Sequence, residues 1–139
     1  MRQMGWRKTF WLIGLWGFST QAVCVNGHPT VASEFRKSKA VVIATVTGEK
    51  KVPETQDGYF LDGTMYQVKI EERFKGSGSD SLQIFSENTS GRFDMTVGGK
   101  YLLFVYAAHG RLSADNCGNS NALSKSIQII QQVEKLAHP

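Results

Sequence analysis

The sequence predicts a mainly β fold, in which a small closed barrel of five strands is followed by a helix. Five short segments have the apolar pattern of strands, and turns rich in glycine and aspartate separate them. Residues 121–137 instead repeat apolar side chains at helical spacing. A closed barrel is favoured over an open five-stranded sheet because closure removes the exposed edge strands.

Residues 1–22 have the three parts of a secretory signal peptide. Three basic residues precede an apolar run of nine residues at 10–18, and Thr20-Gln21-Ala22 supplies small residues before a cleavage point. The run is shorter than the roughly 20 apolar residues that a membrane-spanning helix needs. An uncleaved N-terminal anchor is the alternative. We expect cleavage after Ala22, one domain at residues 23–139, and a secreted or periplasmic protein without membrane contact after cleavage.

Removal of this leader changes the charge balance of the chain. The whole sequence has 16 Lys and Arg against 12 Asp and Glu, and three of the basic residues lie in the leader. The mature chain therefore has 13 basic and 12 acidic residues. This near-neutral balance gives no electrostatic basis for binding nucleic acid or an anionic membrane. We expect a protein partner, no nucleic acid, and a monomer.

Cys24 and Cys117 are the two cysteines of the chain. Cys24 would be the second residue of a mature chain that begins at Val23. Because an exported protein meets an oxidising compartment, we expect these two thiols to form a disulfide. Closing so long a loop adds roughly 4–5 kcal/mol of stability in the chain-entropy model. The alternatives are two metal ligands, which lack neighbouring His or Cys, and a lipidated Cys24, which lacks a small preceding residue.

A short helix and a buried strand are expected first in the mature chain. Val31 and Phe35 are four residues apart, which suits one face of a helix within residues 28–39. Residues 40–51 have apolar side chains on both faces, which is typical of a buried strand. Residues 52–64 contain a proline and two Asp-Gly pairs, which indicate a connecting loop.

The remaining strands follow in the second half of the chain. Gly98-Gly99 can supply a turn with positive φ before an apolar strand. His109-Gly110 then turns the chain again, and His109 is interpreted as a solvated turn residue. The predicted strands are residues 65–74, 81–87, 101–107 and 111–114.

The tail at residues 121–137 is predicted to be one helix. Asn121 is a candidate N-cap because its side chain can accept a hydrogen bond from the first helical turn. One apolar stripe is expected to pack on the strands. It consists of Leu123, Ile127, Ile130 and Val133.

No arrangement of residues typical of an enzyme was found in the sequence. His28, His109 and His138 are far apart along the chain. Asp57 and Asp62 belong to Asp-Gly turns and have no identifiable partner acid for general acid–base work. There is no nucleophile elbow and no phosphate-binding glycine loop. We expect no catalytic residue, no metal site and no cofactor.

The segments follow one another in a characteristic order. An apolar strand (AVVIATV) is followed by a long loop, an alternating strand with a Lys-Gly turn (YQVKIEERFKG), a further strand, the YLLF strand, and a cysteine after a short strand. This order resembles the netrin-like fold, and most of all the bacterial proteins similar to tissue inhibitors of metalloproteinases. The resemblance covers about residues 23–126. The positions that carry it are Phe93, Gly99, Tyr101, Leu102, Phe104, Leu112, Cys117 and Leu123.

This resemblance implies an OB-type five-stranded barrel with flanking helices and, as partner, a zinc metalloprotease that the protein inhibits. In that family the mature N-terminus enters the protease cleft, and a disulfide-bonded cysteine in a C-x-C motif chelates the zinc through its amine and carbonyl. The implied partner-binding residues here are Val23, Cys24 and Val25. This sequence has one cysteine at the C-x-C position and Ser90-Gly91 where many members have Cys-Gly. The Cys24–Cys117 pair would then match the family's second bridge.

The loop at residues 52–64 offers a second candidate binding surface. Tyr59 and Phe60 lie in this loop and Tyr66 follows it. Exposed aromatic residues form binding faces on many OB-type barrels, whereas packing in the core or the loop is the alternative role for these three. If they are exposed, the protein is a secreted or periplasmic module that binds a protein or a glycan without inhibiting a protease.

Overall fold

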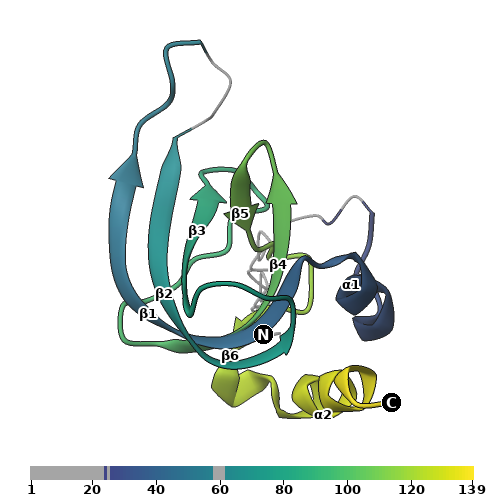
Figure 1. Cartoon of the computed structure of the whole chain (residues 1–139). Helices are drawn as coiled ribbons and strands as arrows, with labels where there is room; N and C mark the ends of the chain where they lie inside the picture. The colour runs from purple at the N-terminus through teal and green to yellow at the C-terminus, as the bar shows by residue number, and fades with distance from the viewer. Residues whose placement is uncertain (1–23, 25, 58–61) are drawn as a thin grey trace, which may run out of the picture.

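The computed structural model describes residue 24, residues 26–57 and residues 62–139 of the 139-residue chain, and its centre is a ring of five strands (Figure 1). The strands are β1 (Ala40–Val52), β2 (Gly63–Lys75), β3 (Ser81–Glu87), β4 (Lys100–Ala108), β5 (Arg111–Ser113) and β6 (Asn121–Ala122). Strand order is β1-β2-β3-β5-β4-β6, and β1 also pairs with β4, which closes the ring. This confirms the predicted mainly β, OB-type fold with a short N-terminal helix and a C-terminal helix.

Two strand pairings complete the ring, one long and one short. β1 and β4 pair antiparallel from Ala40↔Val105 to Thr45↔Lys100. β3 and β5 pair in parallel, and only at Ile84↔Leu112 and Phe85↔Ser113. The ring is therefore near-closed, with its weakest joint between β3 and β5.

The β1–β2 hairpin extends beyond the rest of the ring, at the upper left of Figure 1. Its register continues to Val52↔Gly63, whereas the pairing of β1 with β4 stops at Thr45. Gly63 fits closely against β3, because a Cβ atom there would lie 2.3 Å from the carbonyl oxygen of Ser86. A larger residue would push the two strands apart at the base of the hairpin.

The inside of the ring is filled by side chains that alternate along the strands. On β2, Tyr66, Val68 and Ile70 are buried and the residues between them face water, as predicted for a strand with one wet face. Tyr66 is 3% exposed, so this aromatic residue belongs to the core rather than to a binding face. The buried members of this core are Ala40, Val42, Ala44, Val46, Tyr66, Val68, Ile70, Ile84, Phe93, Met95, Leu103, Val105 and Ala114.

Two helices cover the outer face of β1 and β4, which explains why β1 is apolar on both faces. They are α1 (Val31–Lys37), within the predicted range, and α2 (Ile127–Ala137). The second core lies between these helices and the ring and contains Val31, Val41, Leu102, Phe104 and Val133. Among the helices of the described residues, none has the length and the apolar content needed to cross a membrane.

The tail differs from the prediction of one helix that starts at Asn121. Residues 121 and 122 form β6, which pairs with β4, and the 3-10 turn η1 (Leu123–Lys125) follows. The N-cap of α2 is Ser126, whose hydroxyl donates to the carbonyl of Ala122 at 2.8 Å. The predicted cap at Asn121 is wrong because strand pairing with β4 takes this residue. Ile127, predicted in the buried stripe, is 64% exposed.

Both predicted glycine turns have backbone conformations that favour glycine. Gly98 has a φ of 86° in the turn before β4. His109 and Gly110 have φ values of 52° and 73° in the tight turn between β4 and β5. Because His109 is exposed in this turn, its predicted place as a solvated turn residue is confirmed.

Candidate functional site

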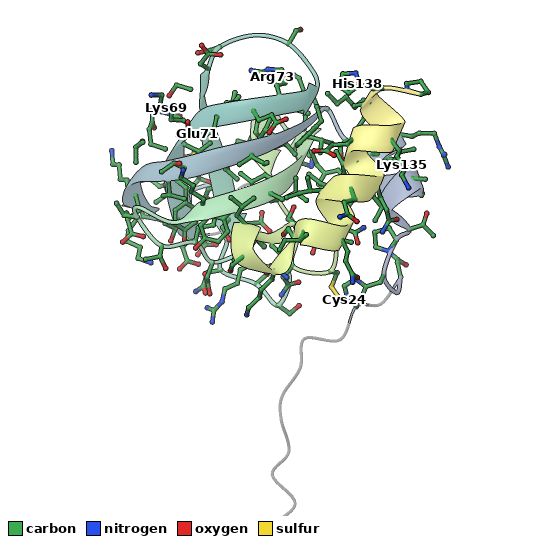
Figure 2. The ribbon with its side chains drawn as sticks, turned by 90° about the horizontal axis from the view of Figure 1, so that it is seen from below. Cys24, Lys69, Glu71, Arg73, Lys135 and His138 are labelled. Carbon is green, nitrogen blue, oxygen red and sulfur yellow. A yellow bond between two sulfur atoms is a disulfide. The ribbon has the colours of Figure 1, made fainter. Side chains whose placement is uncertain are left out.

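A disulfide between Cys24 and Cys117 defines the candidate site. The two Cα atoms are 5.6 Å apart, although 93 positions separate them in the sequence. The bond confirms the predicted pairing and joins the segment before α1 to the loop that follows β5. Figure 2 shows Cys24 at the edge of the molecule, away from Lys69 and Arg73 on β2.

A buried carboxylate holds α1 against the loop that carries Cys117. Glu34 is 1% exposed and lies on the inward side of α1. It accepts hydrogen bonds from the backbone N of Asn119 at 2.7 Å, from Asn119 Nδ2 at 2.6 Å and from the hydroxyl of Tyr106 on β4. Asn119 Nδ2 also donates to the carbonyl of Pro29, just before α1. Three segments of the chain therefore meet at one side chain.

Glycine is needed directly after Cys117. A Cβ atom on Gly118 would lie 2.1 Å from Oε1 of Glu34, which no side chain can do without displacing the carboxylate. The turn before it is fixed by Asp115, whose Oδ1 accepts from the backbone N of Cys117 at 2.8 Å. The position of Cys117 is thus set by its immediate neighbours on both sides.

The Ser90-Gly91 segment is held against the same loop by hydrogen bonds. Asn116 Nδ2 donates to the carbonyl of Ser90 at 3.0 Å, and the backbone N of Asn116 donates to Gly91 at 3.4 Å. These bonds connect the segment after β3 to the residue beside Cys117.

Both ends of α1 are also fixed. Thr30 caps the N-terminus by accepting from the backbone N of Ser33 at 3.1 Å. At the other end, Lys75 Nζ donates to the carbonyls of Phe35 and Arg36 at 2.7 and 2.8 Å. A cation at the C-terminal end of a helix is favourable because the last carbonyls carry a partial negative charge. Hydrogen bonds therefore hold both ends of α1 in place beside the site.

A hollow of about 410 Å³ lies beside the disulfide. We call it the disulfide hollow; Cys24 and Cys117 line it together with residues of α1, of the 90–91 segment and of the 115–117 loop. Its titratable side chains are Glu34, Lys37, Tyr106 and Asp115. Burial, and next the Glu34 carboxylate, raise the pKa of Tyr106 far above its ordinary range, so Tyr106 stays neutral.

A second hollow of about 560 Å³ is also lined by Tyr106. It shares Gly91, Tyr106 and Asp115 with the disulfide hollow and continues toward His109 and Arg111. The guanidinium of Arg111 lies 4.3 Å from the centre of the Phe85 ring. The two hollows therefore adjoin at these three shared residues.

Of the predicted site residues, the structure describes the two cysteines. Val23, Val25, Tyr59 and Phe60 lie outside the described residues. Within the described ranges, no three side chains of His, Cys, Asp or Glu are grouped in a way that could hold a metal ion.

Glu34, Tyr106 and Asn119 were missed by sequence reasoning. A usable indication was present only for Glu34, which stands three positions after Val31 and so shares the apolar face of α1. A charged residue on the inward face of a helix requires buried partners. The sequence does not say which residues supply them.

The chain was compared with family models and with curated proteins, and nothing in either comparison matches it.

Proposed function

We propose that the chain is an exported binding protein that inhibits a zinc metalloprotease through its mature N-terminal segment at Val23–Val25. The single observation that carries the proposal is the Cys24–Cys117 disulfide. Cys24 stands two positions after the predicted cleavage point, so the bond would fasten the new chain end to the barrel. The resemblance to the metalloprotease inhibitors supplies the partner class.

The surroundings of the disulfide support this role. Glu34, Gly118 and Asp115 fix the loop that carries Cys117, and the bond extends this order to Cys24. A segment that is already ordered loses less conformational entropy when it enters a cleft. A free α-amine and the next carbonyl are nitrogen and oxygen donors, which zinc accepts at an open coordination position. The amine must be deprotonated to bind the metal.

The test uses the protein exported with its own leader. Its intact mass with and without reductant gives the first residue and the state of the cysteines. The oxidised protein is then assayed against a panel of zinc metalloproteases. Two controls are matched to it: the Cys24→Ser/Cys117→Ser double variant, and the wild type carbamoylated at its α-amine. We expect inhibition by the unmodified protein alone. No inhibition across the panel would overturn the proposal.

A second candidate function rests on the projecting β1–β2 hairpin (Figure 1). Tyr59 and Phe60 belong to the segment that connects these strands, and a projecting hairpin is accessible to a partner protein or a glycan. In this case the protein binds without inhibiting a protease. The Tyr59→Ala/Phe60→Ala variant would lose binding to an identified partner, while Cys24→Ser/Cys117→Ser would keep it. Undiminished binding by the aromatic variant would exclude this function.

A further inference from the structure

The last six residues of β1 form an edge of the sheet that only one strand covers. β1 pairs with β4 up to Thr45, and Val46 exchanges backbone hydrogen bonds with the turn at 98–99. From there to Val52, β1 pairs only with β2 among the described residues. Alternate N–H and C=O groups of residues 47–52 therefore point away from β2, on the outer side of the projecting hairpin (Figure 1). We call residues 47–52 the open edge.

Three exposed lysines lie around the open edge on the outer side of the sheet. Thr45 faces this side, and its partners in the register are Lys100 on β4 and Lys69 on β2. Lys50 is on the same side, because its partner on β2 stands between two buried residues. Glu71 of β2 shares this side and accepts from Oγ1 of Thr45 at 3.0 Å. The three lysines outnumber this carboxylate, so the outer side is positive beside the open edge.

The inner side of the open edge has the opposite balance of charge. Glu49 faces this side because its partner Tyr66 is buried in the ring. Lys51 is also on this side, donates to Oγ1 of Thr64 at 3.0 Å, and lines a hollow of about 220 Å³ that Arg92 lines too. The hollow has three carboxylates, which belong to Asp62, Glu87 and Asp94. An acidic side chain brought to the inner side would therefore be repelled, whereas an uncharged one would not.

An exposed apolar residue lies at the base of the open edge. Val97 is 49% exposed. It precedes Gly98, whose backbone N donates to the carbonyl of Val46 at 2.8 Å. A strand added along residues 47–52 would begin beside Val97 and cover it. Removal of this apolar surface from water favours such an addition.

A second copy of the chain fits the open edge poorly. Two copies that pair antiparallel about a two-fold axis place one residue of the edge opposite itself. The central residues of the open edge are Glu49 and Lys50, so like charges would face each other. The same axis would set the two positive outer sides next to each other. The charges therefore favour a strand from a different protein.

We propose that the open edge binds an extended segment of a partner protein as an additional strand. This segment carries carboxylates on the outer side, toward Lys50 and Lys100, and uncharged side chains on the inner side. In strand addition, the backbone hydrogen bonds supply affinity and the alternating side chains supply specificity. The surface is separate from the disulfide and from the segment that joins β1 to β2. The inference thus goes beyond the proposed function, and its test needs no protease.

Hydrogen exchange followed by mass spectrometry measures the open edge directly in the oxidised, exported protein. The probe is the synthetic peptide acetyl-TEVEVET-amide, whose glutamates all lie on one side of an extended strand. Two matched peptides are TKVKVKT and a TEVEVET peptide with N-methylated backbone amides. We expect TEVEVET alone to slow exchange at residues 47–52. Residues 40–45 should exchange as before, because β4 already pairs with them.

The decisive variant is Lys50→Glu, which reverses one charge at an exposed position of the open edge. It should bind TEVEVET about fivefold more weakly than the wild type and should bind TKVKVKT more tightly. The matched control is Lys135→Glu, which makes the same change of charge on α2, away from Lys69 in Figure 2. Its affinity for both peptides should equal that of the wild type.

Unchanged exchange at residues 47–52 in the presence of TEVEVET would overturn the inference. Protection by the N-methylated peptide would also overturn it, because it would show attraction of charges without strand pairing. Equal affinities of Lys50→Glu and the wild type would do the same. A free protein that is a dimer with residues 47–52 already protected would show that a second copy occupies the edge. Failure of this test leaves the proposed inhibition standing, and failure of inhibition leaves the strand addition standing.

Discussion

Replacing Glu34 by alanine should destabilise the domain more than any other single removal of a polar group at the site. The change leaves the backbone N of Asn119, Asn119 Nδ2 and the hydroxyl of Tyr106 without the acceptor they share. A buried donor that loses its partner costs about 1–3 kcal/mol. In the variant, Asn119 Nδ2 keeps its hydrogen bond to the carbonyl of Pro29, and the hydroxyl of the partly exposed Tyr106 can bond to water. The full cost of an unpaired donor therefore applies mainly to the backbone N of Asn119.

We therefore expect Glu34→Ala to lower the free energy of unfolding by about 3 kcal/mol. The melting temperature should fall by about 10 °C for a domain of this size. Glu34→Gln is the matched control, because its amide oxygen can accept both bonds from Asn119 while its amide nitrogen donates to the oxygen of Tyr106. The loss in Glu34→Gln should be only about 1 kcal/mol.

Urea unfolding followed by circular dichroism measures these differences. All three tryptophans of the sequence lie in residues 1–22, so a chain cleaved after Ala22 would have no tryptophan fluorescence to follow. Equal losses in Glu34→Ala and Glu34→Gln would refute the reasoning, because the shape and the hydrogen bonds of the side chain would then contribute nothing. A loss below about 1 kcal/mol in Glu34→Ala would refute it as well.

Three further predictions concern the same region. Cys24→Ser/Cys117→Ser should lose about 4 kcal/mol in urea unfolding, because the bond closes a long loop in the unfolded chain; a loss under about 1 kcal/mol would contradict this. Gly118→Ala should lose about 2 kcal/mol because its Cβ atom would meet Glu34, and the loss should largely disappear in a Glu34→Ala background, as a double-mutant cycle would measure. Tyr106 should ionise at higher pH than an ordinary tyrosine, and the absorbance difference between the wild type and Tyr106→Phe would measure this. Because the pKa of Tyr106 is raised in the folded state, its contribution to the free energy of unfolding is complete below about pH 10 and is lost as the pH rises further.

Most elements could be predicted because their sequence patterns are local. Alternation at Tyr66, Val68 and Ile70 indicates a strand with one buried face, and β2 is such a strand. The apolar pattern at 40–51 indicates a strand buried on both sides, and α1 and α2 cover the outer side of β1. The cysteine pair followed from its count and from the predicted export of the chain.

The rest depended on contacts between distant segments, which local patterns do not contain. Asn121 has the side chain of an N-cap, but pairing with Leu102 on β4 makes it part of a strand. Ile84 pairs in parallel with Leu112, and the sequence pattern of neither segment alone indicates this pairing. Glu34 became part of the site only because the fold places Asn119 beside it, 85 positions later in the chain.

The architecture also bears on how this protein folds and oxidises. The β1–β2–β3 meander joins neighbouring segments, whereas β1 meets β4 only when Ala40 reaches Val105. Contacts between distant segments form slowly because loop closure costs entropy. The fold brings the two thiols together although 93 positions separate them, and two cysteines allow a single intramolecular bond. Oxidation of one chain thus needs an oxidant, and there is no wrong intramolecular pairing for an isomerase to correct.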